Sequence, residues 1–130
     1  MDLPKNERSF LFNHNGEVSG RKYEGTFTVR CALSMAEKRS LEIEKSALSA
    51  DLLNPTGNLS AISSVVANLR VRIIKSPDWF KQSILSLDLL DEEVYFELYS
   101  KCLEEADAWM KEVKALASPE KKEGNVQVGS

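Results

Sequence analysis

The stretch Ser76-Pro77-Asp78-Trp79-Phe80, continued after an apolar run by Leu87-Asp88-Leu89-Leu90-Asp91, decides how this chain folds. It joins a segment rich in branched apolar residues to a long acidic one. Serine is a good helix cap, and proline suits the first helical position because its missing amide hydrogen loses no bond there. Asp88 or Asp91 can cap the next helix, where acids suit the helix dipole. The stretch therefore predicts a corner between two helices.

Two large aromatic residues, Trp79 and Phe80, stand directly behind the proline. Beside a turn, such residues most often fill the corner of a hydrophobic core. Tryptophan is also enriched where protein interfaces are driest, so a partner-binding surface is the alternative. Burial within the chain distinguishes the two interpretations.

Helical spacing of apolar residues precedes this corner. Residues 59–74 repeat apolar side chains every three or four positions, which predicts a central core helix. Before it, Ser34-Met35-Ala36-Glu37 is a capping box that begins another helix, and Asn54-Pro55-Thr56-Gly57 ends that helix. The region before the corner therefore predicts two helices.

Downstream of the corner, an apolar stripe over residues 95–116 predicts one long helix that ends near Ser118. At helical rise it is roughly 35–40 Å long, about the width of a small domain, so its distal end either covers the bundle or projects from it. Trp109, Met110 and Val113 lie in that distal part. Together with the two corner aromatics they are the predicted partner-binding residues, with packing inside one subunit as the alternative.

The N-terminal region alternates apolar and polar residues in the way that a strand covered on one side requires. A short strand over 9–13, turn signals at His14-Asn15-Gly16 and Ser19-Gly20-Arg21, and a strand over 23–31 predict a β-hairpin. A lone hairpin is barely stable in water, so its apolar face must pack on the helices or on another chain.

Length and pattern together predict one α+β domain that is mainly α. The 130 residues suit a single core. The expected domain spans residues 9–118, with the hairpin over 9–31 and, over 34–118, a small bundle of three to four helices ending in one long helix. Residues 1–8 are expected to be a loose N-terminus, and the charged segment 119–130 a flexible tail.

Composition argues against nucleic acid and membrane as partners. The formal net charge is -3 and acidic residues crowd the C-terminal third, whereas nucleic-acid binding normally needs a basic stripe. Neither a signal peptide nor a membrane span is recognisable, so a soluble cytosolic protein is expected. Cys31 and Cys102 are far apart in apolar surroundings and are expected to be buried thiols.

No group of residues suggests catalysis, a cofactor or a metal. The two cysteines and the single histidine, His14, cannot supply a four-ligand zinc site. His14 has no acid or cysteine nearby in the sequence, and the glycines form no phosphate-binding loop. We therefore expect a protein that is not an enzyme, with no catalytic, cofactor-binding or metal-binding residues and no cofactor.

The order of these elements resembles the tail assembly chaperones of long-tailed bacteriophages. The resemblance is carried by the strand Tyr23-Glu24-Gly25-Thr26-Phe27-Thr28-Val29, the capping box at Ser34, the sequence Pro77-Asp78-Trp79, and the helix start from Leu89 to Tyr95. It covers about residues 20–116, most of the chain.

This resemblance implies that the protein binds the tape measure protein, the long helical chain that fixes tail length, and keeps it soluble until the tail tube forms around it. It also implies a homo-oligomer in the host cytoplasm that is absent from the mature virion. In many such phages a ribosomal frameshift yields a longer product whose extension contacts the tail, so the tail tube protein is a further expected partner. The Lys121-Lys122 pair is compatible with a slippery adenine run.

Two alternatives come from other classes of protein. One is a structural phage protein of the head-tail connector or tail-completion type, built on a similar plan and retained in the particle. The other is a bacterial protein-protein adaptor. A neighbouring gene for a very long helical chain would favour the chaperone.

Overall fold

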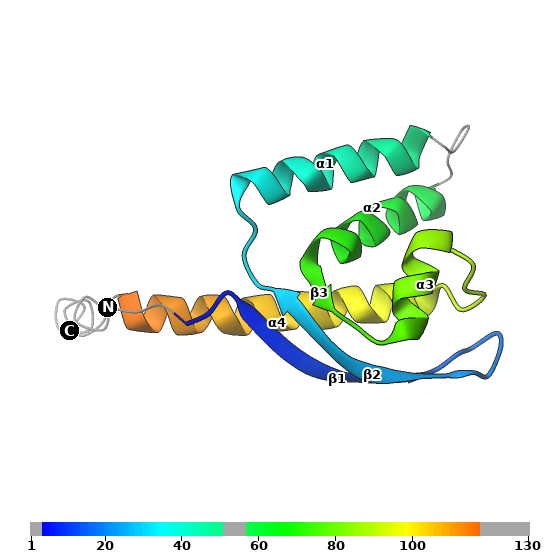
Figure 1. Cartoon of the computed structure of the whole chain (residues 1–130), viewed down its shortest axis with the longest axis horizontal. Helices are drawn as coiled ribbons and strands as arrows, with labels where there is room; N and C mark the ends of the chain where they lie inside the picture. Colours follow the sequence, from blue (N-terminus) through cyan, green and yellow to red (C-terminus); the bar gives the residue numbers. More distant parts are fainter. Residues whose placement is uncertain (1–3, 51–56, 118–130) are drawn as a thin grey trace.

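The computed structural model describes residues 4–50 and 57–117 of the chain. The predicted α+β, mostly helical fold is confirmed, with a hairpin first and the longest helix last (Figure 1). Of the predicted turn Asn54-Pro55-Thr56-Gly57, residues 54–56 lie outside the described residues, as do residues 1–3 and the tail over 119–130. Gly57, predicted to belong to the turn, is instead the first residue of the second helix. The elements in chain order are β1 (Glu7–Asn15), β2 (Lys22–Arg30), α1 (Met35–Ala50), α2 (Gly57–Arg72), β3 (Ile73–Lys75), α3 (Asp78–Ser86) and α4 (Glu93–Ala117).

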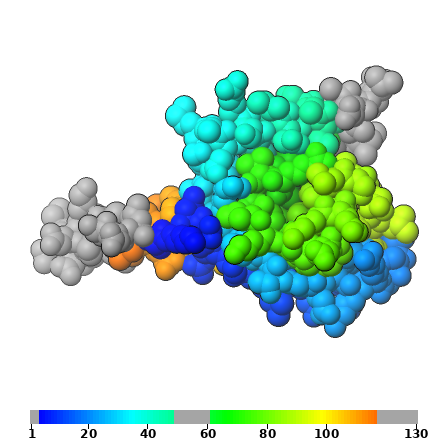
Figure 2. Space-filling model, viewed as in Figure 1, coloured from blue at the N-terminus to red at the C-terminus, as the bar shows by residue number. Residues whose placement is uncertain are grey.

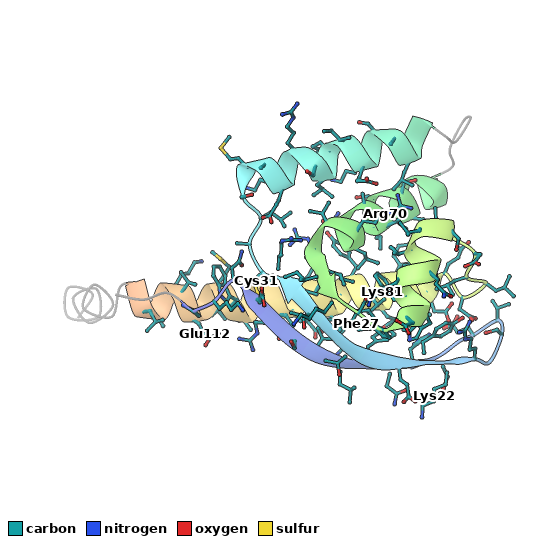
Figure 3. The ribbon with its side chains drawn as sticks, viewed as in Figure 1. Lys22, Phe27, Cys31, Arg70, Lys81 and Glu112 are labelled. Atoms are coloured by element: carbon teal, nitrogen blue, oxygen red, sulfur yellow. The ribbon has the colours of Figure 1, made fainter. Side chains whose placement is uncertain are left out.

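The sheet is antiparallel in the order β1-β2-β3, and one of its faces is apolar. The predicted alternation in β2 is confirmed, because Tyr23, Phe27 and Val29 are all buried. Figure 3 shows Phe27 pointing toward the helices and Lys22 pointing away from them. The hairpin therefore packs on the helices of its own chain, which supply the cover that a two-stranded ribbon needs.

The connection between the two hairpin strands differs from the prediction. The sequence predicts a tight turn at His14-Asn15-Gly16, but the first two of these residues belong to β1. The connection is a longer loop over residues 16–21, called the hairpin loop below. Gly20 in this loop has φ 73°, a conformation that favours glycine. Hydrogen bonds from the loop amides to Asp91 and Glu93, where the chain enters α4, hold the loop in this longer form.

The first helix begins as predicted. The Ser34 amide donates to Glu37 Oε1 (2.8 Å) and the Glu37 amide donates to Ser34 Oγ (3.1 Å), which together form the expected capping box. Glu37 Oε2 also pairs with Arg30 Nε of β2 at 2.7 Å. The pair with Arg30 attaches the first turn of α1 to the end of the hairpin. The helix also packs against α2.

The second helix, α2, is the central core helix, but it ends before the predicted apolar stripe does. Val66 and Leu69 have no exposed surface. Ile73 and Ile74, predicted to be helical, instead form β3, where Ile73 lies opposite Val29 of β2. Branched side chains favour strands, and β2 offers unpaired backbone groups along its edge. Tertiary pairing therefore overrides the helical spacing.

The corner after β3 begins one residue later than predicted, because Pro77 is the N-cap residue and Asp78, not Pro77, is the first helical residue; Ser76 is therefore not the cap. Pro77 precedes α3, and α3 ends at Ser86; the C-cap residue Leu87, with a left-handed φ of 56°, then turns the chain. Gly25 of β2 has φ 151°, and a Cβ at this position would overlap the Pro77 ring. Glycine at position 25 therefore allows the corner to lie against the sheet.

The last helix, α4, completes the core by packing against α2 and β1. Val94, Leu98 and Cys102 are buried on the side that faces them. Both thiols, Cys31 and Cys102, are free and buried as predicted, and burial raises the pKa of Cys102 to about 12. The C-terminal end of α4 extends beyond the sheet, beside the N-terminal segment (Figure 1).

Residues 4–8 correct the prediction of a loose N-terminus. β1 begins at Glu7, two residues before the predicted strand. Asn6 is held by the chain after β2, because its Nδ2 donates to the Ala32 carbonyl at 2.8 Å. Its Oδ1 accepts from the amides of Cys31 (3.2 Å) and Ala32 (2.8 Å). These partners lie about 25 residues further along the chain, beyond what local polarity can indicate.

Candidate functional site

The two corner aromatics among the predicted partner-binding residues lie in an aromatic cluster. Phe80 is 3% exposed and meets the Phe27 ring edge-on, with ring centroids 5.3 Å apart. Trp79 is half-buried, with its ring 5.1 Å from the Tyr23 ring, and its Nε1 donates to the Glu24 carbonyl at 2.9 Å. Phe80 is therefore the corner of the core, and Trp79 leaves only part of its surface open.

The other three predicted residues lie on the distal part of α4. Trp109 is 8% exposed, and its Nε1 donates to the Lys5 carbonyl at 2.9 Å. Val113 is half-buried, whereas Met110 is 40% exposed. Trp109 therefore packs within the chain, and Met110 and Val113 are the two of the three that present surface to another molecule.

Charged contacts also join the distal part of α4 to the N-terminal segment. Arg8 Nε lies 2.8 Å from Glu105 Oε1, and Arg8 Nη1 lies 2.7 Å from Glu112 Oε2. Figure 2 shows the N-terminal segment lying against α4 at this end. The contact of Arg8 with Glu105 is part-buried, whereas the contact with Glu112 is exposed to solvent, where ion pairs stabilise a fold little.

Exposed apolar side chains border the buried stripe of distal α4. Leu103 and Met110 are seven residues apart and lie on one side of the helix, and Val113 follows one turn later. Leu103 is 44% exposed. We call Leu103, Met110 and Val113 the distal apolar flank. Apolar side chains gathered along one helix are the kind of surface by which helices bind apolar partners.

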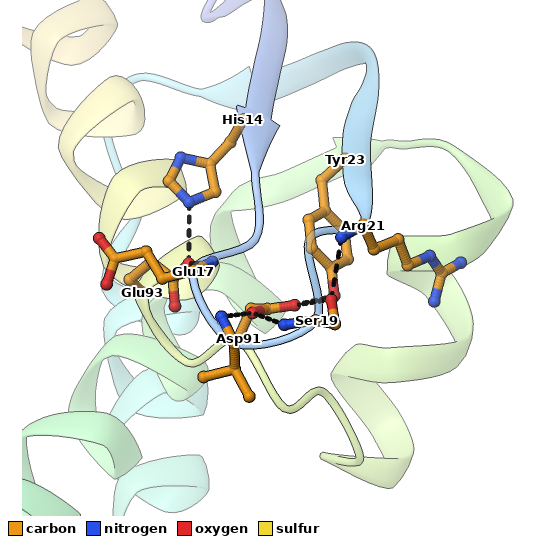
Figure 4. Close-up of polar contacts among 8 residues, drawn as sticks. His14, Glu17, Ser19, Arg21, Tyr23, Asp91 and Glu93 are labelled. Atoms are coloured by element: carbon orange, nitrogen blue, oxygen red, sulfur yellow. Dashed lines mark hydrogen bonds and ion pairs between the residues drawn. The ribbon is translucent and has the colours of Figure 1, made fainter.

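A different arrangement lies at the other end of α4, where the chain enters the helix. Asp91 is fully buried, and its carboxylate accepts four hydrogen bonds (Figure 4). The donors are the amides of Val18 (2.7 Å) and Ser19 (3.0 Å), the Ser19 hydroxyl (2.5 Å) and the Tyr23 hydroxyl (2.7 Å). The predicted role of the Asp91 side chain as a helix cap is wrong, because this side chain binds the hairpin loop.

These donors decide the protonation of Asp91. The Ser19 hydroxyl lowers the pKa of the Asp91 carboxyl most, and it outweighs burial, which acts in the opposite direction. The pKa of Asp91 therefore lies well below its usual range. Burial, together with the bond to this carboxylate, raises the pKa of Tyr23. Asp91 is an anion in the interior, and its charge is compensated by hydrogen bonds.

Glu93, the first residue of α4, holds the beginning of the same loop. Its Oε2 accepts from the Glu17 amide at 2.8 Å and lies 3.0 Å from His14 Nε2. Partial burial raises the pKa of Glu93, but the bonds to His14 and to the Glu17 amide outweigh it, so the pKa is lowered. The hairpin loop is thus attached to α4 through two carboxylates.

Gly16 makes the close approach of these parts possible. It is buried, and a Cβ at this position would overlap the Asp91 carboxylate. Any other residue at position 16 must displace either the loop or Asp91. The glycine that the sequence indicates as a turn residue is therefore needed for a tertiary contact.

An open hollow of about 450 Å³ lies beside the loop. Its lining combines three apolar side chains with two carboxylates, namely Val18, Leu90, Phe96, Glu92 and Glu93. Val18 is 69% exposed and Leu90 is 68% exposed. Sequence reasoning missed both the hollow and the loop contacts, because the residues involved are more than 70 positions apart and no local pattern joins them.

The arrangement offers no evident catalytic group. The Ser19 hydroxyl donates to Asp91, whereas His14 contacts Glu93, so the potential nucleophile and the potential base have different partners. Among residues 4–50 and 57–117, no three His, Cys, Asp or Glu side chains are grouped closely enough to hold a metal ion. No helix within the described ranges has the length and apolarity that crossing a bilayer demands.

Comparison of the chain with protein-family models, with curated proteins and with solved structures found no match.

Proposed function

We propose that this protein is a tail assembly chaperone of a long-tailed bacteriophage, which binds the tape measure protein and keeps it soluble while the tail is built. The resemblance in the order of elements supports this proposal. It comprises the strand over 23–29, the capping box at Ser34, the corner at Pro77-Asp78-Trp79 and the start of the long helix after Leu89.

The observation that carries the proposal is the distal apolar flank. A chaperone for a long apolar helix needs an apolar surface of its own, kept soluble by charged neighbours. Leu103 and Met110 are exposed on α4. Glu104 and Asp107 lie between them in the sequence, and the side chains of both are largely exposed. The flank can therefore offer contacts to a partner helix while the charged residues keep the free protein in solution.

Burial narrows the set of residues proposed to bind the partner. Met110 and Val113 remain contact residues, and Trp79 contributes the part of its ring that is open. Phe80 and Trp109 support these surfaces from within the core. Self-association through the same flank would repeat the apolar surface along a long partner. Location in the host cytoplasm, absence from the virion and a longer form that contacts the tail tube protein rest on the resemblance alone.

Co-expression with a tape measure fragment tests the proposal. Met110→Asp should leave the protein folded and send the fragment into the insoluble fraction, because a charge would enter the apolar contact. Leu85→Asp is the matched control, since Leu85 is 75% exposed on α3, away from the flank, and should keep the fragment soluble. A fragment that stays equally soluble with both variants would contradict the role of the flank.

Mass spectrometry of purified phage particles tests the class of protein. A chaperone should be absent from the particles, whereas a connector or a tail-completion protein should be present at a fixed copy number. Detection of the chain in the particles would overturn the proposal in favour of the structural alternative.

A further inference from the structure

Exposed apolar side chains gather where the hairpin loop meets the start of α4, at the opposite end of that helix from the distal apolar flank. Val18 and Leu90 are each more than two-thirds exposed. They line the hollow of about 450 Å³ together with the half-buried Phe96. Single exposed apolar residues are ordinary on a protein surface, but a group that shares one concave surface suggests a binding site.

The loop that carries Val18 is held in place rather than loosely exposed. The amides of Val18 and Ser19 donate to the buried Asp91, and the Glu17 amide donates to Glu93. A buried carboxylate is costly unless several donors compensate it, so this loop conformation is strongly favoured. Val18 is therefore presented in a fixed position, which lowers the conformational entropy that this loop loses when a partner binds.

The backbone of the loop has no amide left for a partner. Besides the three bonds to the carboxylates, the Gly16 amide donates to the Arg21 carbonyl, the Gly20 amide to the Gly16 carbonyl, and the Arg21 amide to Ser19 Oγ. Every amide from Gly16 to Arg21 thus donates within the chain. A partner strand could not pair with these groups, so recognition must use side chains, as when a helix lays its apolar face into a groove.

The charge around the hollow is negative. Glu92 and Glu93 line it, and Glu17 and Asp88 are exposed in the two loops that border it. The nearest basic group of the hairpin loop, Arg21, lies over the Tyr23 ring at 5.4 Å and does not line the hollow. A partner with lysine or arginine beside its apolar residues would complement this rim and associate faster because of it.

A small-molecule ligand fits the hollow less well. Pockets for such ligands usually enclose most of the ligand surface. This hollow is open, and only five residues line it. A protein segment needs no enclosure, because a few apolar anchors on a shallow surface supply most of its binding energy.

We propose that this hollow is a docking surface for an amphipathic helix of a partner protein, whose apolar face meets Val18, Leu90 and Phe96 and whose flanking basic residues face Glu92 and Glu17. The inference is independent of the proposed chaperone function, because it uses neither the distal apolar flank nor a tape measure protein.

The test uses a synthetic amphipathic helix of leucine and lysine, about five turns long, and a leucine-glutamate peptide of the same pattern. Binding to the full chain is measured by fluorescence anisotropy at near-physiological salt. The lysine peptide should bind, and the V18S/L90S double variant should weaken its binding about tenfold or more. Leu85→Ser is the apolar control, since Leu85 lines a separate hollow beside Lys81, and it should change binding less than about twofold.

A second pair of variants separates local charge from net charge. Glu92→Gln should weaken the lysine peptide about threefold or more, whereas Glu104→Gln, which removes one charge from distal α4, should change binding little. Unchanged thermal midpoints show that each variant is folded. Equal effects of Glu92→Gln and Glu104→Gln, no effect of V18S/L90S, or equal binding of the two peptides would each overturn the proposal.

Discussion

The two ends of α4 are attached to the hairpin in different ways. At the start of the helix, which we call the loop end, the fully buried carboxylate of Asp91 accepts four hydrogen bonds from the hairpin loop and from Tyr23. At the distal end, the Trp109 indole donates to the Lys5 carbonyl, and the guanidinium of Arg8 lies between two partly exposed carboxylates. Charges take part at both ends, but only the loop end encloses a charge completely, namely that of Asp91.

This difference in solvation decides which end fixes the fold. A buried charge that loses a partner retains its full desolvation cost, whereas an exposed ion pair that breaks recovers its contacts from water. The loop end should therefore be rigid and sensitive to substitution, and the distal end tolerant. The distal end of α4 can therefore exchange its contacts with the N-terminal segment for contacts with a partner, and the domain stays folded.

The largest effect should come from Asp91→Asn. The amide group keeps the shape of the carboxylate but removes the charge and places an NH2 group before donors that need an acceptor. We expect the thermal midpoint, followed by circular dichroism, to fall by about 10 °C or more. The control is Asp88→Asn. Asp88 is exposed in the loop between α3 and α4 that also holds Asp91, and its replacement should shift the midpoint by less than about 2 °C. Equal shifts would remove the distinction between the two ends.

Tyr23→Phe should give the next largest effect. It deletes the hydroxyl that donates to Asp91 at 2.7 Å and leaves the ring packed. Loss of a bond to a charged group should lower the free energy of unfolding by about 2 kcal/mol, measured by urea denaturation. Tyr95→Phe is the matched control, because the Tyr95 hydroxyl donates to the neutral Ser83 carbonyl, and its loss should cost about 1 kcal/mol. A larger loss in Tyr95→Phe would contradict the special weight given to the carboxylate.

Acid should weaken the loop end in a defined range of pH. The pKa of Asp91 is lowered in the folded protein, so the unfolded chain binds the proton first as pH falls below the ordinary value of 3.8. Stability is therefore full above that value and is lost progressively below it. Ser19→Ala removes the strongest donor and raises the folded pKa toward 3.8, so the total acid-dependent loss in urea midpoint should be smaller than in the wild type.

The control for the acid series is Ser9→Ala. Ser9 Oγ contacts Thr28 Oγ1 at 2.8 Å, in an exposed pair of β1 and β2. Its variant should follow the wild-type pH dependence in parallel. If Ser19→Ala also runs parallel to the wild type, hydrogen bonding by Ser19 does not determine the titration of Asp91.

The smallest effect should come from the distal end. Arg8→Gln removes both contacts to Glu105 and Glu112, yet we expect the thermal midpoint to change by less than about 2 °C, and less still in high salt. Tryptophan fluorescence should report any local loosening near Trp109. A fall as large as that of Asp91→Asn would show that the distal end is as much a part of the rigid fold as the loop end.

Local features of the fold were predictable because they depend on neighbours in the sequence. The capping box at Ser34 and Glu37 forms as expected, since its partners are three residues apart. The buried face of β2 follows from the alternation that includes Phe27 and Val29. The start of α3 is predictable to within one residue, because Pro77 has no amide hydrogen and cannot continue a preceding backbone hydrogen-bond pattern.

Features that depend on distant partners were not predictable. Ile73 and Ile74 continue a helical spacing, but pairing with β2 makes them a strand. Trp109 falls on the expected helix stripe, yet the sequence does not indicate that the Lys5 carbonyl accepts its indole hydrogen. Of the five predicted partner-binding residues, Phe80 and Trp109 are buried by segments whose approach no local pattern describes.

Asp91 separates the two kinds of information. The sequence by itself determined that an acid stands before the last helix, in the corner between two helices, because backbone chemistry within a few residues defines such positions. Only the tertiary structure decided that its side chain does not cap the helix but binds Ser19 and Tyr23, about 70 residues earlier. The physical reason is desolvation: a carboxylate enclosed by the fold must accept hydrogen bonds from whichever donors the fold brings to it, wherever they stand in the chain.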